Sequence, residues 1–185
     1  PLVLKMMAAA EKTSSATRRY LYCKATKSLF KLLHARLMLP TKGKISLRHH
    51  KGQRTLIFDG RNTHFYGAFC SDLELGYEAA SLALLEVLID RNGVFYDIGS
   101  NFGYFSLSLA AHPGFDGKIH AFEPHPSSFS DLESLTIQAE MGERITCHQI
   151  ALSDRDGTGT LRFDPLHSAL TKIVHGNGGP DVIVS

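Results

Sequence analysis

The second half of the chain alternates short apolar runs with longer amphipathic segments. The short runs are rich in Val, Ile and aromatic residues, which is typical of buried strands, and the longer segments have helical spacing. Strands that alternate with helices pair in parallel through right-handed crossovers, so we predict an α/β fold with a mainly parallel sheet. The predicted strands are residues 94–98, 118–122, 145–150, 158–163 and 182–184; the predicted helices are 103–111 and 126–140, and 164–181 is predicted as loop.

Before these strands, the pattern predicts an N-terminal helix and a β-hairpin extension. Apolar residues three or four apart over 18–39 mark an amphipathic helix, which Pro40 ends. Short alternating runs separated by turn residues follow, and they predict a hairpin or meander. The apolar residues that follow have helical spacing as far as Ile89, and Ser71 or Asp72 is the predicted N-cap of this helix. The alternating runs span 44–47, 55–58 and 63–69. The helix that ends at Ile89 is predicted to begin near Leu75.

Charge is divided unevenly along the chain, although the formal net charge is only +2. Residues 1–54 hold 13 Lys and Arg residues and one acidic residue, a net charge of +12. Residues 55–185 hold 7 Lys and Arg residues and 17 Asp and Glu residues, a net charge of −10. We expect the basic part to contact an anionic surface, a polyanion or the acidic remainder of its own domain. Together with the patterns above, this predicts three parts, at 1–43, 44–93 and 94–185.

Composition places the chain among ordinary globular proteins. Its 185 residues suffice for one domain, and 43% hydrophobic and 21% charged residues are usual values. No apolar run reaches the roughly 18 residues of a membrane span. The three cysteines are scattered and the ten histidines lack metal-ligand spacing, so we predict a reducing, cytoplasmic setting and no metal site. The basic helix leaves contact with a membrane surface open. The sequence lacks an initiator Met, so we expect it to be a fragment.

The most informative stretch is the predicted turn after the strand 94–98. It reads Asp97-Ile-Gly-Ser-Asn-Phe-Gly103, and the next predicted strand ends on Glu123. Glycines at such a turn let a ligand approach the backbone, and an acid at the tip of the next strand can bind two ribose hydroxyls. The pattern predicts a nucleoside-binding half-site; the plainer alternative is an ordinary turn, braced by the carboxylate of Asp97.

The spacing of the glycines separates two kinds of nucleoside site. A dinucleotide fingerprint that begins at Gly99 needs glycine at positions 101 and 104, which are Asn101 and Tyr104 here. The D-x-G-x-x-x-G form instead resembles the first motif of S-adenosylmethionine-dependent methyltransferases. With Ala-Phe-Glu-Pro at 121–124 and Ala-Leu-Ser-Asp at 151–154, the chain resembles the FkbM family over about residues 74–170. Two departures are Ser100 in place of alanine and Leu135 in place of asparagine.

The resemblance implies a Rossmann-like class I methyltransferase fold, of which 94–185 would be the N-terminal half and the remainder would lie beyond this sequence. It implies S-adenosyl-L-methionine as cofactor and transfer of its methyl group to a hydroxyl on a small molecule or glycan. The catalytic residue stays unassigned, because the acceptor side belongs to the part of the family domain absent here, and we expect the fragment alone to be inactive. The implied cofactor-binding residues are Asp97, Gly99, Asn101, Gly103, Glu123 and Ala151.

Three other functions remain open from the sequence. A nicotinamide-dependent oxidoreductase is disfavoured by the missing glycines. A nucleic-acid methyltransferase would use residues 1–54 as a basic arm. A non-catalytic nucleoside-binding module would keep the fold without turnover. The oligomeric state is not predicted.

Overall fold

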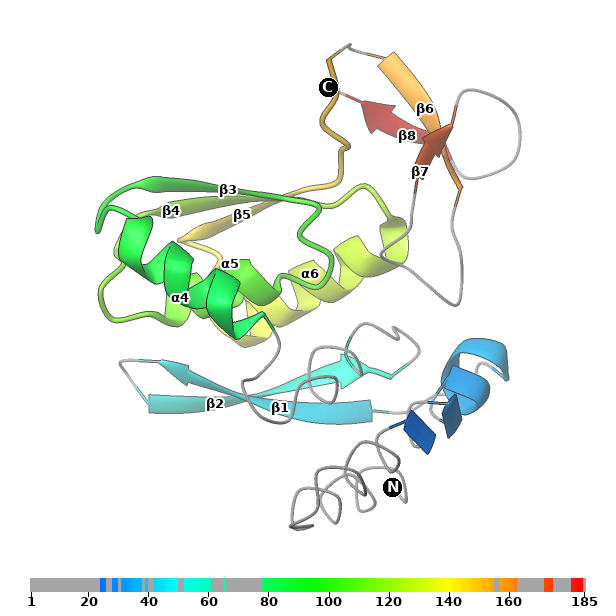
Figure 1. Ribbon diagram of the computed structural model, residues 1–185, viewed down its shortest axis with the longest axis horizontal. Helices are drawn as coiled ribbons and strands as arrows, with labels where there is room; N and C mark the ends of the chain where they lie inside the picture. The colour runs from blue at the N-terminus through cyan, green and yellow to red at the C-terminus, as the bar shows by residue number, and fades with distance from the viewer. Residues whose placement is uncertain are drawn as a thin grey trace.

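The structure is a computed structural model of the chain, and its centre is a parallel three-stranded sheet (Figure 1). The strands are β3 (Val94–Ile98), β4 (Lys118–Phe122) and β5 (Ile145–His148), in the order β3-β4-β5. The prediction of an α/β protein with a parallel sheet is confirmed. The residues that the structure describes are 24–25, 28–29, 31–37, 39, 42–49, 52–60, 65, 78–154, 157–162, 172–174 and 181–184.

Two helices cover one face of this sheet. The crossovers from β3 to β4 and from β4 to β5 run through α5 (Tyr104–Ala111) and α6 (Pro126–Gln138), which lie beneath the sheet in Figure 1. Helix α4 (Ala79–Leu88) precedes β3 and contacts α5. The apolar side chains between sheet and helices form the core, as the sequence pattern requires of a half-covered sheet. Its fully buried members include Leu109, Phe115, Ile119, Ala121, Leu132 and Leu135.

The other face of the sheet is open at β3. Side chains alternate along a strand, and the three that point away from the helices are Val94, Tyr96 and Ile98, which are 52%, 58% and 66% exposed. The rings of Tyr96 and Phe122 lie nearly parallel, with centroids 6.1 Å apart. The ring of His148 lies on the far side of Phe122, and the centroids of these two rings are 4.6 Å apart. An aromatic row therefore crosses all three strands on this face.

A β-hairpin forms a further layer below the helices (Figure 1). Strands β1 (Lys42–His49) and β2 (Gly52–Asp59) pair antiparallel, which confirms the predicted hairpin. The carboxamide of Gln138 on α6 donates to the carbonyl of Ile57 at 3.0 Å and accepts from its backbone N–H at 2.7 Å. An ion pair also joins Arg54 to Glu140. The hairpin is thus joined to the C-terminal end of α6 by one carboxamide and one ion pair.

The C-terminal part of the chain adds a small antiparallel sheet, seen at the right of Figure 1. It contains β6 (Gly157–Arg162), β7 (Lys172–Val174) and β8 (Asp181–Val184), in the order β7-β6-β8. The strands at 158–163 and 182–184 were predicted within one residue of their ends. The prediction of loop throughout 164–181 is wrong at β7, because pairing with β6 imposes extended backbone on Lys172–Val174.

Two N-terminal predictions also need correction. Residues 24–25 and 28–29 of the predicted helix 18–39 are helical, as predicted, but residues 31–36 form a π-helix, η1 (Lys31–Arg36), in which Leu37 donates to the carbonyl of Leu32 at 3.0 Å. Phe65, predicted in a strand at 63–69, is helical and buried, with its ring stacked 4.1 Å from that of Phe58. Tertiary packing overrides the local pattern here. Residues 18–23 of the predicted helix 18–39 lie outside the described residues.

Helix α4 begins later than predicted. It starts at Ala79 rather than near Leu75, because Glu78 has a φ of 52°, in the left-handed region that a right-handed helix cannot contain. The predicted caps, Ser71 and Asp72, lie outside the described residues. No helix in the described residues is long and apolar enough to cross a bilayer.

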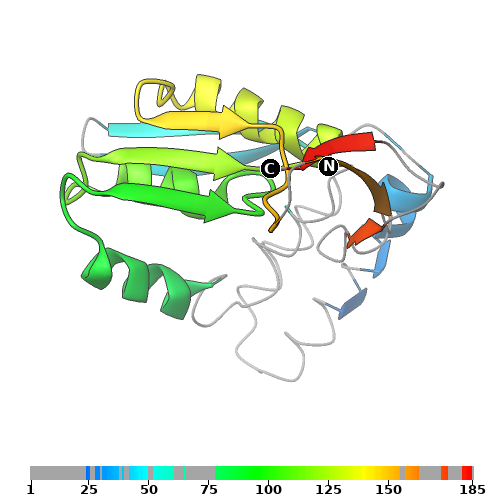
Figure 2. The ribbon, with the colours of Figure 1, turned by 90° about the horizontal axis from the view of Figure 1, so that it is seen from above.

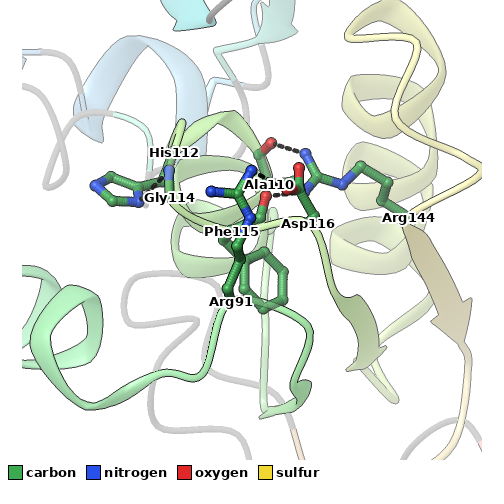
Figure 3. Close-up of polar contacts among 7 residues, drawn as sticks. All are labelled: Arg91, Ala110, His112, Gly114, Phe115, Asp116 and Arg144. Carbon is green, nitrogen blue, oxygen red and sulfur yellow. Dashed lines mark hydrogen bonds and ion pairs between the residues drawn. The ribbon is translucent and has the colours of Figure 1, made fainter.

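The amino ends of the strands are joined by a polar clamp (Figure 3). The guanidinium of Arg144, just before β5, donates to the carbonyls of Ala110 and Phe115 and lies 5.6 Å from the centroid of the Phe115 ring. Asp116, just before β4, pairs with Arg144 at 3.7 Å and with Arg91, before β3, at 2.5 Å. These contacts fix the edge of the sheet opposite to the predicted site.

Candidate functional site

The carboxyl ends of β3 and β4 bring the predicted turn and the predicted acid together. The two strands are parallel and in register, so that Ile98 lies opposite Phe122. The backbone N–H groups of Gly99 and Ser100 both donate to the carbonyl of Phe122, at 2.9 and 3.0 Å. In the view from above, both strands point to this edge of the sheet (Figure 2). Glu123 therefore follows β4 directly beside the turn, as the sequence predicted.

Glu123 is the centre of this arrangement. Its Oε2 accepts a hydrogen bond from the backbone N–H of Asn101 at 2.9 Å, and its Oε1 accepts from that of His125 at 2.8 Å. The residue is only 7% exposed, so Glu123 is not a solvent-exposed acid at the end of a strand. Burial raises the pKa of this carboxyl, while the two N–H groups oppose that shift and the nearby Asp97 adds to it.

Asp97 is held by the helix rather than by the turn. Its Oδ2 accepts from both the backbone N–H and the hydroxyl of Ser106, at 3.2 and 2.5 Å. The sequence predicted that Asp97 braces the turn, but both of these bonds come from Ser106 on α5. The residue is 7% exposed, and burial raises the pKa of its carboxyl, with the two bonds from Ser106 opposing the rise. Asp97 thus links β3 to α5.

The two glycines of the turn have different surroundings. Both have positive φ, 75° at Gly99 and 85° at Gly103, which L side chains rarely adopt. A Cβ at Gly99 would meet no atom within 4 Å, whereas a Cβ at Gly103 would lie 2.6 Å from Cδ1 of Leu132 on α6. Gly99 therefore faces open space that a ligand can enter. At Gly103, the lack of a side chain is needed for the packing of α5 against α6.

Asn101 and Ala151 take smaller parts. Asn101 has a φ of 51°, and its Oδ1 accepts from the N–H of Phe102 at 2.9 Å, so its side chain stabilises the turn itself. Ala151 follows β5 and is buried, and it takes no part in the hydrogen bonds that join the turn to Glu123. Five of the six predicted residues are thus assembled at one edge of the sheet, and Ala151 lies after the end of the next strand, β5.

Three residues of the site were not singled out for these roles from the sequence. Ser106 is the partner of Asp97 and is fully buried, and its position as one of two serines in a mainly apolar helix is the signal that could have found it. His125 supplies an N–H to Glu123, and burial lowers the pKa of its imidazole, which favours the neutral form. Ser100 has a buried hydroxyl for which the described residues provide no hydrogen-bond partner.

The arrangement can accept the nucleoside part of a ligand. The open side of Gly99 leaves room at the backbone, and the hydroxyl of Ser100 at the same turn is a polar group for which the described part of the chain supplies no partner. A carboxylate has about four lone-pair positions, so Glu123 can accept two ribose hydroxyls besides its two N–H donors. The residues are therefore compatible with the nucleoside part of the cofactor that the family resemblance implies. No group of three His, Cys, Asp or Glu that could hold a metal occurs in the described part of the chain.

Comparison with known proteins gives no relative for this chain. No protein-family model, no curated protein and no solved structure matches it.

Proposed function

We propose that this chain binds S-adenosyl-L-methionine at the turn between β3 and α5, as part of an FkbM-type methyltransferase that methylates a hydroxyl on a small molecule or glycan. The observation that carries the proposal is the hydrogen bond from Asn101 to Glu123, which holds the strand-end acid against a turn that is open at Gly99. The order β3-β4-β5, with α5 and α6 on one face, is compatible with the first half of a Rossmann-like sheet.

Each residue has a defined task in this proposal. Glu123 accepts the two ribose hydroxyls, and its backbone donors keep the carboxylate aimed at the turn. The backbone at Gly99 makes room for the amino-acid end of the ligand, and the hydroxyl of Ser100 is a further donor there. Asp97 holds β3 and α5 at a fixed distance, and the unused Oδ1 of its carboxyl can accept from an ammonium group.

The sulfonium of the bound cofactor supplies an activated methyl group. The protein contributes by positioning the acceptor oxygen in line with the methyl group, because such placement accounts for much of the acceleration. A general base that takes the hydroxyl proton assists such a reaction. We assign no residue of this chain to that step.

Calorimetry with S-adenosylhomocysteine and with NAD tests the proposal. We expect the wild-type chain to bind S-adenosylhomocysteine and not NAD. Glu123→Ala should weaken binding by about 1.5–3 kcal/mol, or about 10- to 150-fold, because it removes a charged hydrogen-bond acceptor. Glu133→Ala, an exposed acid on α6, is the matched control and should leave affinity unchanged. Tighter binding of NAD, or equal affinity in both variants, would contradict the assignment.

The cellular setting is part of the same proposal. The thiol of Cys147 is free, which agrees with a reducing compartment, and we propose a cytoplasmic location. Contact between residues 1–54 and an anionic surface stays a prediction. Vesicle binding at low and high salt, with and without residues 1–39, tests it.

A further inference from the structure

The turn between β3 and α5 uses its own backbone N–H groups inside the protein. Each N–H group of residues 99 to 103 donates to an acceptor among the described residues, at 2.8 to 3.0 Å. The acceptors, in chain order, are the carbonyl of Phe122 for the first two, Oε2 of Glu123, Oδ1 of Asn101 and the carbonyl of Ser100. A glycine turn that binds phosphate needs such N–H groups to point at the ligand. These five N–H groups are therefore already used, and a phosphate at the turn would have to displace their acceptors.

The N-terminus of α5 is likewise occupied by an acid of the chain itself. A helix N-terminus attracts anions because its first N–H groups have no partner within the helix and its dipole is positive there. In α5, Oδ2 of Asp97 accepts from the backbone N–H of Ser106, in the first turn of the helix, at 3.2 Å. Asp97 is buried, so an anion that approached this helix end would meet carboxyl oxygens that little water screens.

Asp97 and Glu123 together make this edge of the sheet acidic. Asp97 lies opposite Ala121 in the pairing of β3 with β4, and Glu123 follows two positions later. Burial is the largest cause that raises the pKa of Glu123, and the charge of Asp97 adds to it. In the described part of the chain, no Lys or Arg forms an ion pair with either acid. Two acids at close range disfavour a further negative charge and favour a positive one.

We propose that this site selects its ligand by the group at the ribose 5′ carbon, favouring a cationic group and rejecting a phosphate. The selection depends on the proposed function, because Glu123 must hold the ribose hydroxyls for the 5′ group to reach the turn. A phosphate there would need N–H donors that the protein already uses, and it would place negative charge beside two buried acids. An ammonium or sulfonium group needs no N–H donor and is attracted by both acids. The site thus separates a nucleoside with a cationic substituent from nucleotides.

Calorimetry with three ligands that differ at one position tests the selection. The ligands are 5′-amino-5′-deoxyadenosine, adenosine and adenosine 5′-monophosphate, which are cationic, neutral and anionic at the 5′ carbon and otherwise share the base and the ribose hydroxyls. The wild-type chain should bind them in that order of decreasing affinity, with at least about tenfold between the first and the last. Higher salt should narrow this difference. This comparison needs no variant, so it does not depend on whether a substitution is tolerated.

Two substitutions separate the effect of charge from that of the occupied donors. Asp97→Asn removes one acid and keeps an acceptor for Ser106, so it should narrow the affinity ratio at least about threefold. Glu133→Gln, at an exposed acid of α6, is the matched control and should leave the ratio unchanged. Glu123→Ala releases two backbone N–H donors, so the monophosphate should lose less affinity than adenosine does. Circular dichroism shows whether each variant is folded.

Failure of the selection and failure of the nucleoside site give different results. Adenosine that does not bind the wild-type chain, or that binds Glu123→Ala equally well, would contradict the nucleoside site and the selection with it. Adenosine binding that depends on Glu123, together with equal or tighter binding of the monophosphate, would overturn the selection alone. So would an Asp97→Asn variant that weakens all three ligands alike, because Asp97 would then act through structure and not through charge.

Discussion

The backbone N–H of Asn101 donates to Oε2 of Glu123 at 2.9 Å, although 22 positions separate the two residues in the sequence. The bond joins the turn after β3 to the end of β4, so that the acid and the backbone beside Gly99 form one unit. The second oxygen of Glu123 is fixed in the same way by His125. A carboxylate held from two sides needs little further ordering when a ligand arrives, which favours binding.

Substitution of Gly99 and Gly103 should affect different properties, mainly ligand binding at Gly99 and mainly stability at Gly103. Gly99→Ala should cost about 1–2 kcal/mol of stability, from its positive φ alone, but should greatly weaken binding of S-adenosylhomocysteine. Gly103→Ala adds overlap with Leu132 and should cost about 2–5 kcal/mol. Urea unfolding and calorimetry measure the two effects.

A double variant checks the reason for the cost at Gly103. Adding Leu132→Ala removes the overlapping methyl group, so the two substitutions together should cost less than the sum of each alone. Simple additivity would show that Leu132 is not the obstacle.

The buried carboxyl of Asp97 should make stability depend on pH. Burial raises its folded-state pKa above the usual 3.8, so the folded protein holds this proton more tightly than the unfolded chain. The stabilisation is complete below 3.8 and is lost as pH rises through the raised pKa. Asp97→Asn keeps an acceptor for Ser106 without the charge. Its unfolding free energy should therefore improve relative to wild type as pH rises from the usual 3.8 through the raised pKa of Asp97, measured by urea unfolding.

Glu123 provides the control for this titration. The pKa of its carboxyl is also raised, chiefly by burial, so it contributes a pH dependence of the same sign in both proteins. A difference between wild type and Asp97→Asn that is flat with pH would show that Asp97 does not titrate in this range.

The clamp at the amino ends of the strands allows a matched pair of substitutions. Arg144→Ala should lower the unfolding free energy by about 2–4 kcal/mol, because it leaves the carbonyls of the buried residues Ala110 and Phe115 without their donor. Arg91→Ala removes an ion pair to the same Asp116, but its side chain is 66% exposed, and the cost should be about 0–1 kcal/mol. Equal costs in thermal or urea unfolding would contradict this distinction.

The contact between the hairpin and α6 should depend on one carboxamide. Gln138→Ala removes both bonds to Ile57 and should cost about 1–2 kcal/mol, with faster hydrogen exchange at the amide of Ile57. Ser134→Ala removes only a neighbour of that carboxamide and should have a smaller effect. Unchanged exchange in Gln138→Ala would show that apolar packing alone holds the hairpin.

The parallel sheet was the most predictable part of the fold. The ends of β3 and β4 match the predicted 94–98 and 118–122, because turn residues bound each apolar run on both sides. Parallel pairing then places Glu123 beside Gly99, since the carboxyl ends of adjacent strands meet at one edge. The position of the candidate site therefore follows from sequence pattern and topology.

The partners within the site could not be predicted in the same way. Spacing alone does not distinguish a glycine that faces a ligand from one that faces a helix, and only the distance to Leu132 separates Gly103 from Gly99. The bond from Ser106 to Asp97 likewise depends on how α5 packs on β3. The strand β7 was missed because its pairing comes from β6 rather than from its own short sequence.

The carboxamide of Gln138 imitates a neighbouring strand. It offers Ile57 one donor and one acceptor, as a backbone peptide group would, and so a helix side chain occupies a place where another chain could otherwise add a strand to β2. The outer edge of β2 therefore has a built-in stop against sheet growth at Ile57.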